Sequence, residues 1–368
     1  MTKKTLNNIF FLAGVACVVV MLLTFDISFK ELWYHLCTAG YWLIPVIGVW
    51  IFIYGLNALA WRAIIKGNTD PDEHVGFWRI YKLTISGYAL NYATPVGGLG
   101  GEPYRILELT KDISKEHATS SVILYAMMHF FAHFWFWFSS IFIYVALVLI
   151  GDLPINTTIG ITLGAIALFC MAAFWLFQKG YKGGLVINVM KFLSKIPGLK
   201  GWSKRFTERH RTSLENIDKQ IAALHSQDKR AFYTSFFLEY MSRVVQSLEI
   251  MFMLLMFDID CGGGFAGYAL VFLHSILILS FTTLCANLIG FLPMQLGVQE
   301  GGFMLSIPAT IGHSVRAALS PQKLIAVGFY VSLICRVREI LWILIGIVLM
   351  KMWNKDEGGR DEGLRMKD

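Results

Sequence analysis

Long apolar runs separated by short polar segments make up most of this chain. An α-helix needs roughly 20 apolar residues to cross a bilayer, and several runs approach or exceed that length. These runs are residues 9–25, 42–61, 120–150, 159–177, 232–257 and 324–350. The pattern predicts an all-α polytopic membrane protein with about six complete transmembrane helices.

Two further apolar regions are interrupted by glycine and proline. One leads into Thr94–Arg105 and the other into Pro293–Gly302. In both segments a proline stands seven positions before a glutamate. Because glycine and proline end helices, we predict that each region forms a broken or re-entrant helix hairpin. Two short complete spans in place of each hairpin remain the alternative.

Charged residues make up 15% of the chain, against about 25% in soluble domains. Residues 182–230 hold eleven Lys or Arg and four Asp or Glu, a surplus equal to the net charge of +7. Apolar residues recur within this segment at helical spacing, which predicts an amphipathic helix on the anionic membrane surface. The positive-inside rule then places the segment on the cytoplasmic side.

Counting spans from this cytoplasmic segment places both termini in the cytoplasm. An odd number of spans separates the two hairpins, so we expect inverted copies that meet near the middle of the membrane. Glu102 and Glu300 should then approach each other. The predicted organisation is one membrane domain over 1–352, with inverted repeats at roughly 42–150 and 232–350, a basic cytoplasmic insert at 178–230 and a disordered tail at 353–368.

The two interrupted segments carry groups suited to hold a polar ligand inside a membrane. Glycines expose peptide N–H groups, a helix start favours an anion, and arginine presents donors that match phosphate. A glutamate there can pair with arginine, bind a cation or carry a proton. The structural alternative is that the glycines permit close helix packing and the glutamates form ion pairs. The candidate substrate-binding residues are Pro95, Gly97, Gly98, Gly100, Gly101, Glu102, Arg105, Pro293, Gln295, Gly297, Gln299 and Glu300.

Three more substrate-binding candidates, Glu239, Arg243 and Arg336, lie inside predicted spans. Glu239 and Arg243 are four residues apart, and Arg336 and Glu339 are three apart, so each pair shares one helix face and can neutralise itself. Charged residues at membrane depth mark ligand pathways. A self-neutralising pair is equally a structural contact, and both interpretations stay open.

Other polar residues of the spans have simpler interpretations. His129 and His133 are one helical turn apart, and packed, hydrogen-bonded histidines are favoured over a proton relay. Hydrogen bonds between helices are expected for Asn57, Asn91, Gln246 and Asn287.

No nucleotide-binding loop, nucleophile motif or metal-ligand spacing occurs in the sequence. The six cysteines are scattered and are predicted to be small core residues, not a disulfide or zinc framework. We therefore predict no catalytic residue, no metal, no cofactor and no nucleic-acid partner. The expected partners are membrane lipids, either anionic phospholipid or polyprenyl phosphate, and the sequence leaves oligomer formation open.

The stretch Pro-Val-Gly-Gly-Leu-Gly-Gly-Glu-Pro-Tyr-Arg at 95–105, together with Leu-Gly-Val-Gln-Glu-Gly at 296–301, resembles the flippase-like lysylphosphatidylglycerol synthase transmembrane family. Arg336 in the last span also fits this family. Gln295 and Gln299 depart from it, because glycine or arginine often stands there.

The resemblance implies movement of a lipid between the leaflets of a bacterial or archaeal cytoplasmic membrane. Bifunctional members of the family carry a soluble aminoacyl-transferase domain after the membrane part. We expect this activity to be absent, because only an 18-residue tail follows the last span.

Three functions fit these observations. A lipid flippase or scramblase would hold an anionic or modified headgroup between the two hairpins while the acyl chains stay in the bilayer. The alternatives are a membrane-embedded lipid-modifying enzyme, with Glu102 or a histidine as acid or base, and an ion-coupled transporter of small solutes. We favour lipid translocation, either passive or driven by an ion gradient or the membrane potential.

Overall fold

The computed structural model describes most of the chain from residue 40 onward. The described residues are 40–67, 75–93, 100–182, parts of 187–219, 229–259, 264–289, 297–311 and 319–365, and the side chains of 179–182, 202, 204 and 352–365 are not described. The predicted first span, 9–25, therefore lies outside the described residues. So do the candidate residues Pro95, Gly97, Gly98, Pro293 and Gln295.

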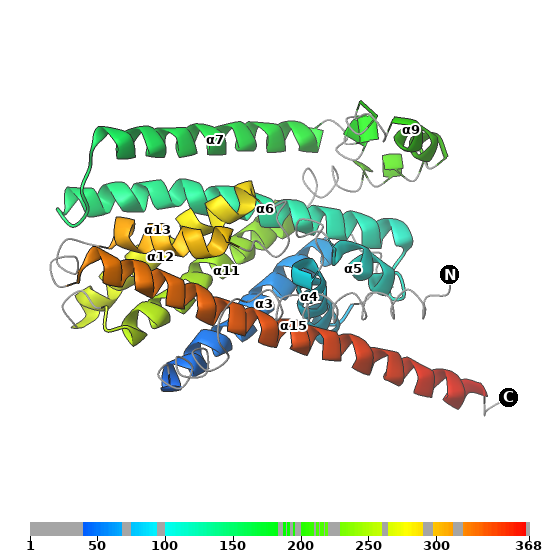
Figure 1. Ribbon diagram of the computed structural model, residues 1–368. Coiled ribbons are helices and arrows are strands. Elements are labelled where there is room, and N and C mark those ends of the chain that lie inside the picture. Colours follow the sequence, from blue (N-terminus) through cyan, green and yellow to red (C-terminus); the bar gives the residue numbers. More distant parts are fainter. Residues whose placement is uncertain are drawn as a thin grey trace.

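Every regular element in the described part of the chain is a helix (Figure 1). The elements are η1 (Gly40–Trp42), α3 (Leu43–Lys66), α4 (Phe77–Ala93), α5 (Glu102–Leu109), α6 (Lys115–Leu149), α7 (Thr157–Lys182), α9 (Lys200–Arg209), α11 (Lys229–Met256), α12 (Gly264–Leu288), α13 (Val298–Thr310) and α15 (Pro321–Arg365). A helix satisfies its backbone hydrogen bonds within one segment, which is what an apolar run needs in lipid. The predicted all-α class is confirmed.

In the part of the chain that the structure describes, four helices are long and apolar enough to cross a membrane. They are Gly40–Lys66, Lys115–Leu149, Thr157–Gln178 and Gly264–Leu288. The first three confirm the predicted spans 42–61, 120–150 and 159–177. The helices α11 and α15 coincide with the predicted spans 232–257 and 324–350, but both carry buried charged residues. The protein is a polytopic membrane protein.

The helix α11 lies at the centre of the bundle. It packs most extensively against α3 and also contacts α6 and α12, while α15 contacts α4 and α13 (Figure 1). Two large apolar cores result. One surrounds Trp61 and Tyr125, and the other surrounds Phe136, Ile250 and Phe303.

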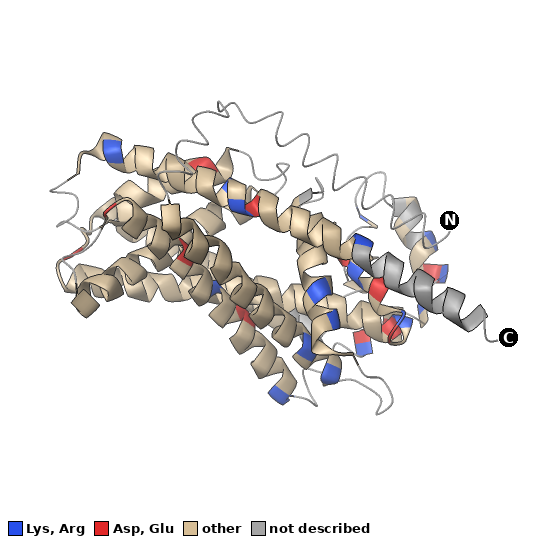
Figure 2. Cartoon of the chain, turned by 90° about the horizontal axis from the view of Figure 1, so that it is seen from below, with Lys and Arg blue, Asp and Glu red and all other residues tan. Residues whose placement is uncertain are grey.

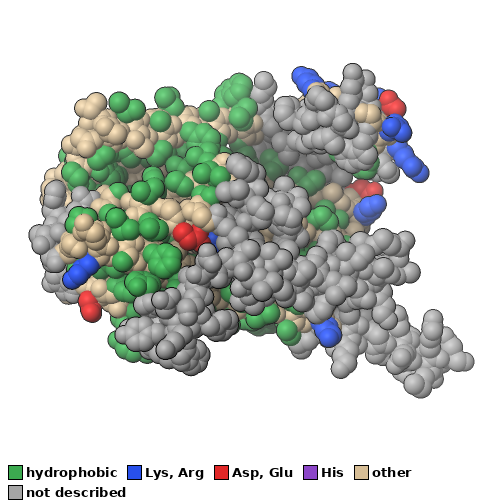
Figure 3. All heavy atoms as spheres, viewed as in Figure 1, with side chains coloured by type: hydrophobic (Ala, Val, Ile, Leu, Met, Phe, Trp, Pro, Cys, Tyr) green, Lys and Arg blue, Asp and Glu red, His purple; other side chains and the backbone are tan. Residues whose placement is uncertain are grey.

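The helix α7 lies on the outside of α6 (Figure 1). Its large apolar side chains Ile161, Leu168 and Trp175 are exposed, and hydrophobic side chains spread over this face of the molecule (Figure 3). An exposed apolar surface of this kind is suited to contact with lipid.

The helices α4 and α5 form a hairpin that is closed at its base. Near the start of α4, Arg79 Nε donates to Asp112 Oδ2 at 2.8 Å, and Arg79 Nη2 donates to the carbonyl oxygen of Glu108 at 2.9 Å. Further along, Gly101 and Gly87 let the two helices touch, since a Cβ on Gly101 would overlap the Gly87 carbonyl. The start of α4 therefore lies beside the end of α5, as the predicted hairpin requires.

The second interrupted region is built differently. Thr282 Oγ1 lies 3.2 Å from Ser306 Oγ, and a Cβ on Gly302 would meet the Thr282 methyl group at 2.9 Å, so α13 runs beside the C-terminal half of α12. The 25 residues of α12 are long enough to cross a membrane alone. Of the two predicted alternatives, a re-entrant hairpin or short complete spans, the length of α12 favours a complete span for this arm, because no glycine or proline interrupts residues 268–289.

The C-terminal helix also differs from the prediction. The helix α15 continues to Arg365 and so enters the segment 353–368, for which the sequence predicts a disordered tail. No proline interrupts this segment, and its lysine, glutamate and arginine residues have good helix propensity. Most of the described Lys and Arg residues lie toward this end of the bundle, and fewer charged residues lie along the rest of the helices (Figure 2).

Candidate functional site

The helix α5 begins with a carboxylate that is tied to α4. Oε1 of Glu102 accepts a hydrogen bond from Arg105 Nη1 at 2.8 Å and from Asn91 Nδ2 at 3.3 Å. The backbone N–H of Gly101 donates to Asn91 Oδ1 at 2.6 Å. The sequence predicts that the N–H groups at this helix start bind an anion, but the Gly101 N–H is occupied by Asn91.

Arg105 is almost completely buried, with 1% of its surface exposed. Its Nη2 donates to the carbonyl oxygen of Thr84 at 3.2 Å, and its side chain passes over Gly87, where a Cβ would overlap it. Three aromatic rings surround the guanidinium and stabilise its charge. Their centroids lie 4.8 Å (Tyr88), 5.4 Å (Tyr125) and 5.6 Å (Trp61) from its carbon.

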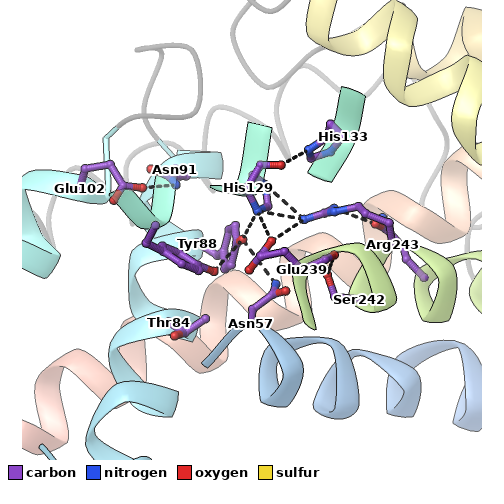
Figure 4. Close-up of polar contacts among 12 residues, drawn as sticks. Asn57, Thr84, Tyr88, Asn91, Glu102, His129, His133, Glu239, Ser242 and Arg243 are labelled. Atoms are coloured by element: carbon purple, nitrogen blue, oxygen red, sulfur yellow. Dashed lines mark hydrogen bonds and ion pairs between the residues drawn. The ribbon is translucent and has the colours of Figure 1, made fainter. Parts of the chain in front are cut away.

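A second group of charged residues lies around His129 (Figure 4). His129 of α6 places Nδ1 2.8 Å from Glu239 Oε2 and 3.0 Å from the Tyr88 hydroxyl. Arg243 Nη2 lies 3.1 Å from Nδ1 and 3.2 Å from Nε2 of the same ring. Asn57 of α3 donates to the Tyr88 hydroxyl at 3.4 Å. We call Tyr88, Asn91, Glu102, Arg105, His129, Glu239 and Arg243 the first cluster.

The predicted pair of Glu239 and Arg243 is loose, with 3.9 Å between Glu239 Oε2 and Arg243 Nη2. His129 is the closer partner of both residues. The histidines therefore differ: His129 belongs to a charged cluster, whereas His133 contacts the His129 carbonyl oxygen at 2.9 Å. Both histidines are packed and hydrogen-bonded, as the favoured interpretation predicts, and the partners of His129 in addition include charged residues.

In the second half of the chain, Arg336 lies between two carboxylates. Nε and Nη2 of Arg336 donate to the two oxygens of Glu300 at 2.9 and 3.3 Å, and Nη1 donates to Glu339 Oε2 at 2.9 Å. The spacing of Arg336 and Glu339 thus predicted their contact correctly. Glu300 also accepts from the Gly297 N–H at 2.8 Å, so the protein's own carboxylate caps α13.

Arg338 extends this group toward α3 and α11. Its Nε donates to Glu249 Oε1 at 2.8 Å, and its guanidinium carbon lies 4.0 Å from the Trp50 ring centroid. Trp50 Nε1 donates to Glu249 Oε2 at 2.9 Å, and Gln299 Nε2 donates to Glu339 Oε1 at 3.3 Å. We call Trp50, Glu249, Gln299, Glu300, Arg336, Arg338 and Glu339 the second cluster.

Tyr54 of α3 connects the two clusters. Its ring centroid lies 5.6 Å from that of Tyr88 and 5.4 Å from that of Trp50. It also lies 4.9 Å from Trp342 of α15, with the rings edge to face. An unbroken series of aromatic rings therefore leads from one cluster to the other.

The clusters differ in how completely their hydrogen bonds are made. Buried polar groups are nearly always paired. In the first cluster, Glu102 Oε2, Arg105 Nε and Arg243 Nε are buried without a hydrogen-bond partner. Within the described side chains, no charged atom of the second cluster is in that state. The first cluster therefore retains hydrogen-bonding capacity that a ligand can use.

The clusters also differ in charge. With a neutral histidine, the first cluster balances Glu102 and Glu239 against two guanidinium groups. The second cluster holds three carboxylates against the guanidinium groups of Arg336 and Arg338. One negative charge is thus left over in the second cluster.

Of the described candidates, Glu102, Arg105, Glu239 and Arg243 come together in the first cluster, and Gln299, Glu300 and Arg336 in the second. Glu102 and Glu300 each pair with an arginine of their own half. The helices α5 and α13 lie toward different ends of the bundle (Figure 1), which differs from the expected close approach of the two glutamates. Gly100 lies in the turn before α5, outside the two clusters.

Sequence reasoning missed the aromatic side chains of the site. A signal for two of them is the spacing of Trp50 and Tyr54, which places both on one face of α3. In the part of the chain that the structure describes, no group of three or more His, Cys, Asp or Glu side chains is arranged to hold a metal ion.

Comparison with known proteins identifies the family and nothing more specific. No curated protein and no solved structure matches the chain. The family described as the lysylphosphatidylglycerol synthase TM region matches residues 11–320. This match includes both interrupted segments and every member of the first cluster, and it ends just before α15, which carries Arg336. The chain belongs to the lysylphosphatidylglycerol synthase TM region family.

Proposed function

We propose that the protein translocates a lipid with a phosphate-containing headgroup across the cytoplasmic membrane of a bacterium or archaeon. The lipid is an anionic or headgroup-modified phospholipid, or a polyprenyl phosphate. One observation carries the proposal: the first cluster buries charged groups with unused hydrogen-bonding atoms inside an apolar helix bundle. Buried charges at membrane depth are costly and mark the pathways of ligands.

The chemistry of the first cluster supports a phosphate ligand. Arg105 and Arg243 supply planar donor groups, which suit phosphate better than a point charge does. Glu102 neutralises Arg105 in the absence of a ligand and is 15% exposed, whereas Arg105 is 1% exposed. An incoming phosphate would compete with this carboxylate for Arg105. The arginine would therefore be neutralised both with and without a bound lipid.

The second cluster supports a path that continues beyond the first. Glu300 is 24% exposed and covers Arg336, which is 2% exposed, so the arrangement of an accessible glutamate over a buried arginine occurs twice. The headgroup would lie between the two interrupted segments while the acyl chains stay in the bilayer. We propose that the lipid is moved without chemical change, with no partner beyond membrane lipids.

Reconstituted protein tests this proposal. Liposomes that contain labelled phosphatidylglycerol or a labelled polyprenyl phosphate are treated with a membrane-impermeant quencher, and the loss of protected label is timed. Wild-type protein should speed the loss of protected label. Glu102→Gln should slow this loss about tenfold or more. The variant lacks one charge-assisted hydrogen bond, which changes the free energy of headgroup exchange by about 1.5 kcal/mol or more.

The matched control is Glu215→Gln, because Glu215 also pairs with an arginine but is 41% exposed on the basic insert. This variant should translocate lipid like wild type. The proposal fails if wild-type protein matches empty liposomes with both lipids, or if Glu102→Gln and Glu300→Gln both match wild type. Mass spectrometry of the recovered lipid separates translocation from the enzyme alternative, which predicts a new lipid product.

A further inference from the structure

The ring of His129 lies between a carboxylate and a guanidinium. Nδ1 is 2.8 Å from Glu239 Oε2, and Arg243 Nη2 is 3.1 Å from Nδ1 and 3.2 Å from Nε2. A ring nitrogen and a carboxylate oxygen at 2.8 Å must share a proton, because two lone pairs would repel each other. Arg243 Nη2 is almost equally far from both ring nitrogens, so the guanidinium lies against the ring, while His129 and Glu239 hold one proton between them.

Arg243 opposes a second proton on the ring. A guanidinium is always charged and has donors only, so protonating the ring would place two positive charges in contact, 3.1–3.2 Å apart, in a buried site. Moving Arg243 away from His129 therefore favours protonation of the ring.

Arg243 is held more loosely than the other buried arginines of the clusters. Its carboxylate partner Glu239 is 3.9 Å away, and its Nε is buried without a hydrogen-bond partner. The remaining contact is from Nη1 to Gln246 Oε1 at 2.9 Å. By contrast, Arg105 and Arg336 each contact a carboxylate oxygen at 2.9 Å or less. An anion can therefore draw Arg243 away from its partners at a lower cost in free energy than Arg105 or Arg336.

We propose that His129 and Arg243 form a coupled site that binds one proton together with one phosphodiester or phosphomonoester anion. The anion draws Arg243 away from the ring, and the ring takes the proton. Linkage then requires each ligand to raise the affinity for the other by the same factor. This inference rests on the proposed function and adds that lipid movement is coupled to a proton gradient.

The surrounding charges favour this joint binding. The titratable and charged groups that face His129 are Tyr88 on α4, Glu102 and Arg105 on α5, Tyr125 and His133 on α6, and Glu239 and Arg243 on α11. Without an anion, two guanidinium groups oppose a second proton on the ring. A singly charged anion and a proton entering together leave the total charge unchanged, which avoids the cost of adding net charge in a low dielectric.

Proton uptake by the wild-type protein tests the site without any substitution. Detergent-solubilised protein in weakly buffered solution near pH 6.5 is mixed with phosphatidylglycerol, with dimethyl phosphate or with diacylglycerol, and the pH change is recorded. We expect uptake of about one proton per protein with phosphatidylglycerol. Proton uptake with dimethyl phosphate as well would show that the phosphodiester group is sufficient for binding. Proton uptake with phosphatidylglycerol but not with dimethyl phosphate would show that the site requires the whole lipid. Equal responses to all three compounds, or no uptake, would overturn the proposal.

Lipid distribution in liposomes tests the coupling. One-to-one coupling predicts that a pH difference of one unit shifts the leaflet ratio of phosphatidylglycerol up to about tenfold, with lipid accumulating away from the acidic side. His129→Gln should bring the ratio close to that without a gradient, and the neighbouring His133→Gln should keep the wild-type shift. Thermal melting of both variants in detergent confirms that they are folded.

The result separates this inference from the function on which it rests. If wild-type protein translocates lipid but the leaflet ratio does not depend on the pH gradient, proton coupling is overturned and lipid translocation still stands. A gradient response retained in folded His129→Gln protein would equally overturn it. No translocation under any condition would overturn both proposals.

Discussion

The short helices that follow the two interrupted segments both begin with a glutamate bound to an arginine, but the structures around them differ. In the first half, α4 and α5 close on each other through Arg79, and the cluster keeps unpaired polar atoms. In the second half, α12 is long enough to span a membrane alone, and every charged atom of the described cluster is paired or exposed. Similar sequence patterns thus occur beside a cluster with unpaired buried atoms in one half and beside a fully bonded cluster in the other.

The strongest test of this comparison removes the central arginine of the second cluster. Arg336→Gln would leave Glu300 and Glu339 without the guanidinium that binds both. Removing one partner of a buried ion pair typically costs about 3–5 kcal/mol, so we expect a large fall in melting temperature in detergent. Arg211→Gln, which breaks an exposed pair on the basic insert, should cost only about 0.3–0.5 kcal/mol. Equal melting temperatures for the two variants would show that the second cluster does not stabilise the bundle.

A smaller effect is expected where the two helices of the first hairpin touch. Gly101→Ala would place a methyl group against the Gly87 carbonyl, and such overpacking costs roughly 1–3 kcal/mol. Gly164→Ala, on the outer face of α7 with open space around it, should be neutral or slightly stabilising because alanine favours helix. Thermal melting of both variants measures the difference. A stable Gly101→Ala protein with wild-type lipid translocation would argue that the closed hairpin is not needed.

The smallest effect is expected from removing the surplus carboxylate of the second cluster. Glu339→Gln keeps an oxygen acceptor for Arg336 and leaves two carboxylates against two guanidinium groups. We expect a stability change within about 1 kcal/mol, measured by the same melting assay. A loss as large as that of Arg336→Gln would mean that the full charge of Glu339 is required and that the leftover negative charge is balanced elsewhere.

Local spacing made one part of the site predictable. Arg336 and Glu339 meet because three residues along a helix bring two side chains to the same face. His129 and Glu239 lie 110 positions apart, and only the packing of α6 against α11 brings them together. Hydropathy identifies both helices but not their relative rotation, so the sequence could not identify this contact.

The hydrogen-bond partners of the Asn and Gln side chains were likewise only partly predictable from the sequence. Asn57 and Asn91 bond to side chains on other helices, as predicted. Asn287 instead donates to the carbonyl oxygen of Thr283 in its own helix, and Gln246 accepts from Arg243 one turn away. The prediction of bonds between helices was wrong for these last two contacts, because a side chain near its own backbone or helical neighbour needs no partner across the bundle.

The position of Tyr54 has a consequence for how the two halves can be studied. Its ring touches Tyr88 on one side and Trp50 and Trp342 on the other, so a shift in one cluster must be absorbed by a ring that the other cluster also contacts. Residues that share a packed neighbour give non-additive energies. The change in unfolding free energy caused by a substitution in one cluster therefore holds only while the other cluster is intact. Adding the changes measured for single substitutions in the two clusters would misstate the stability of the double variant.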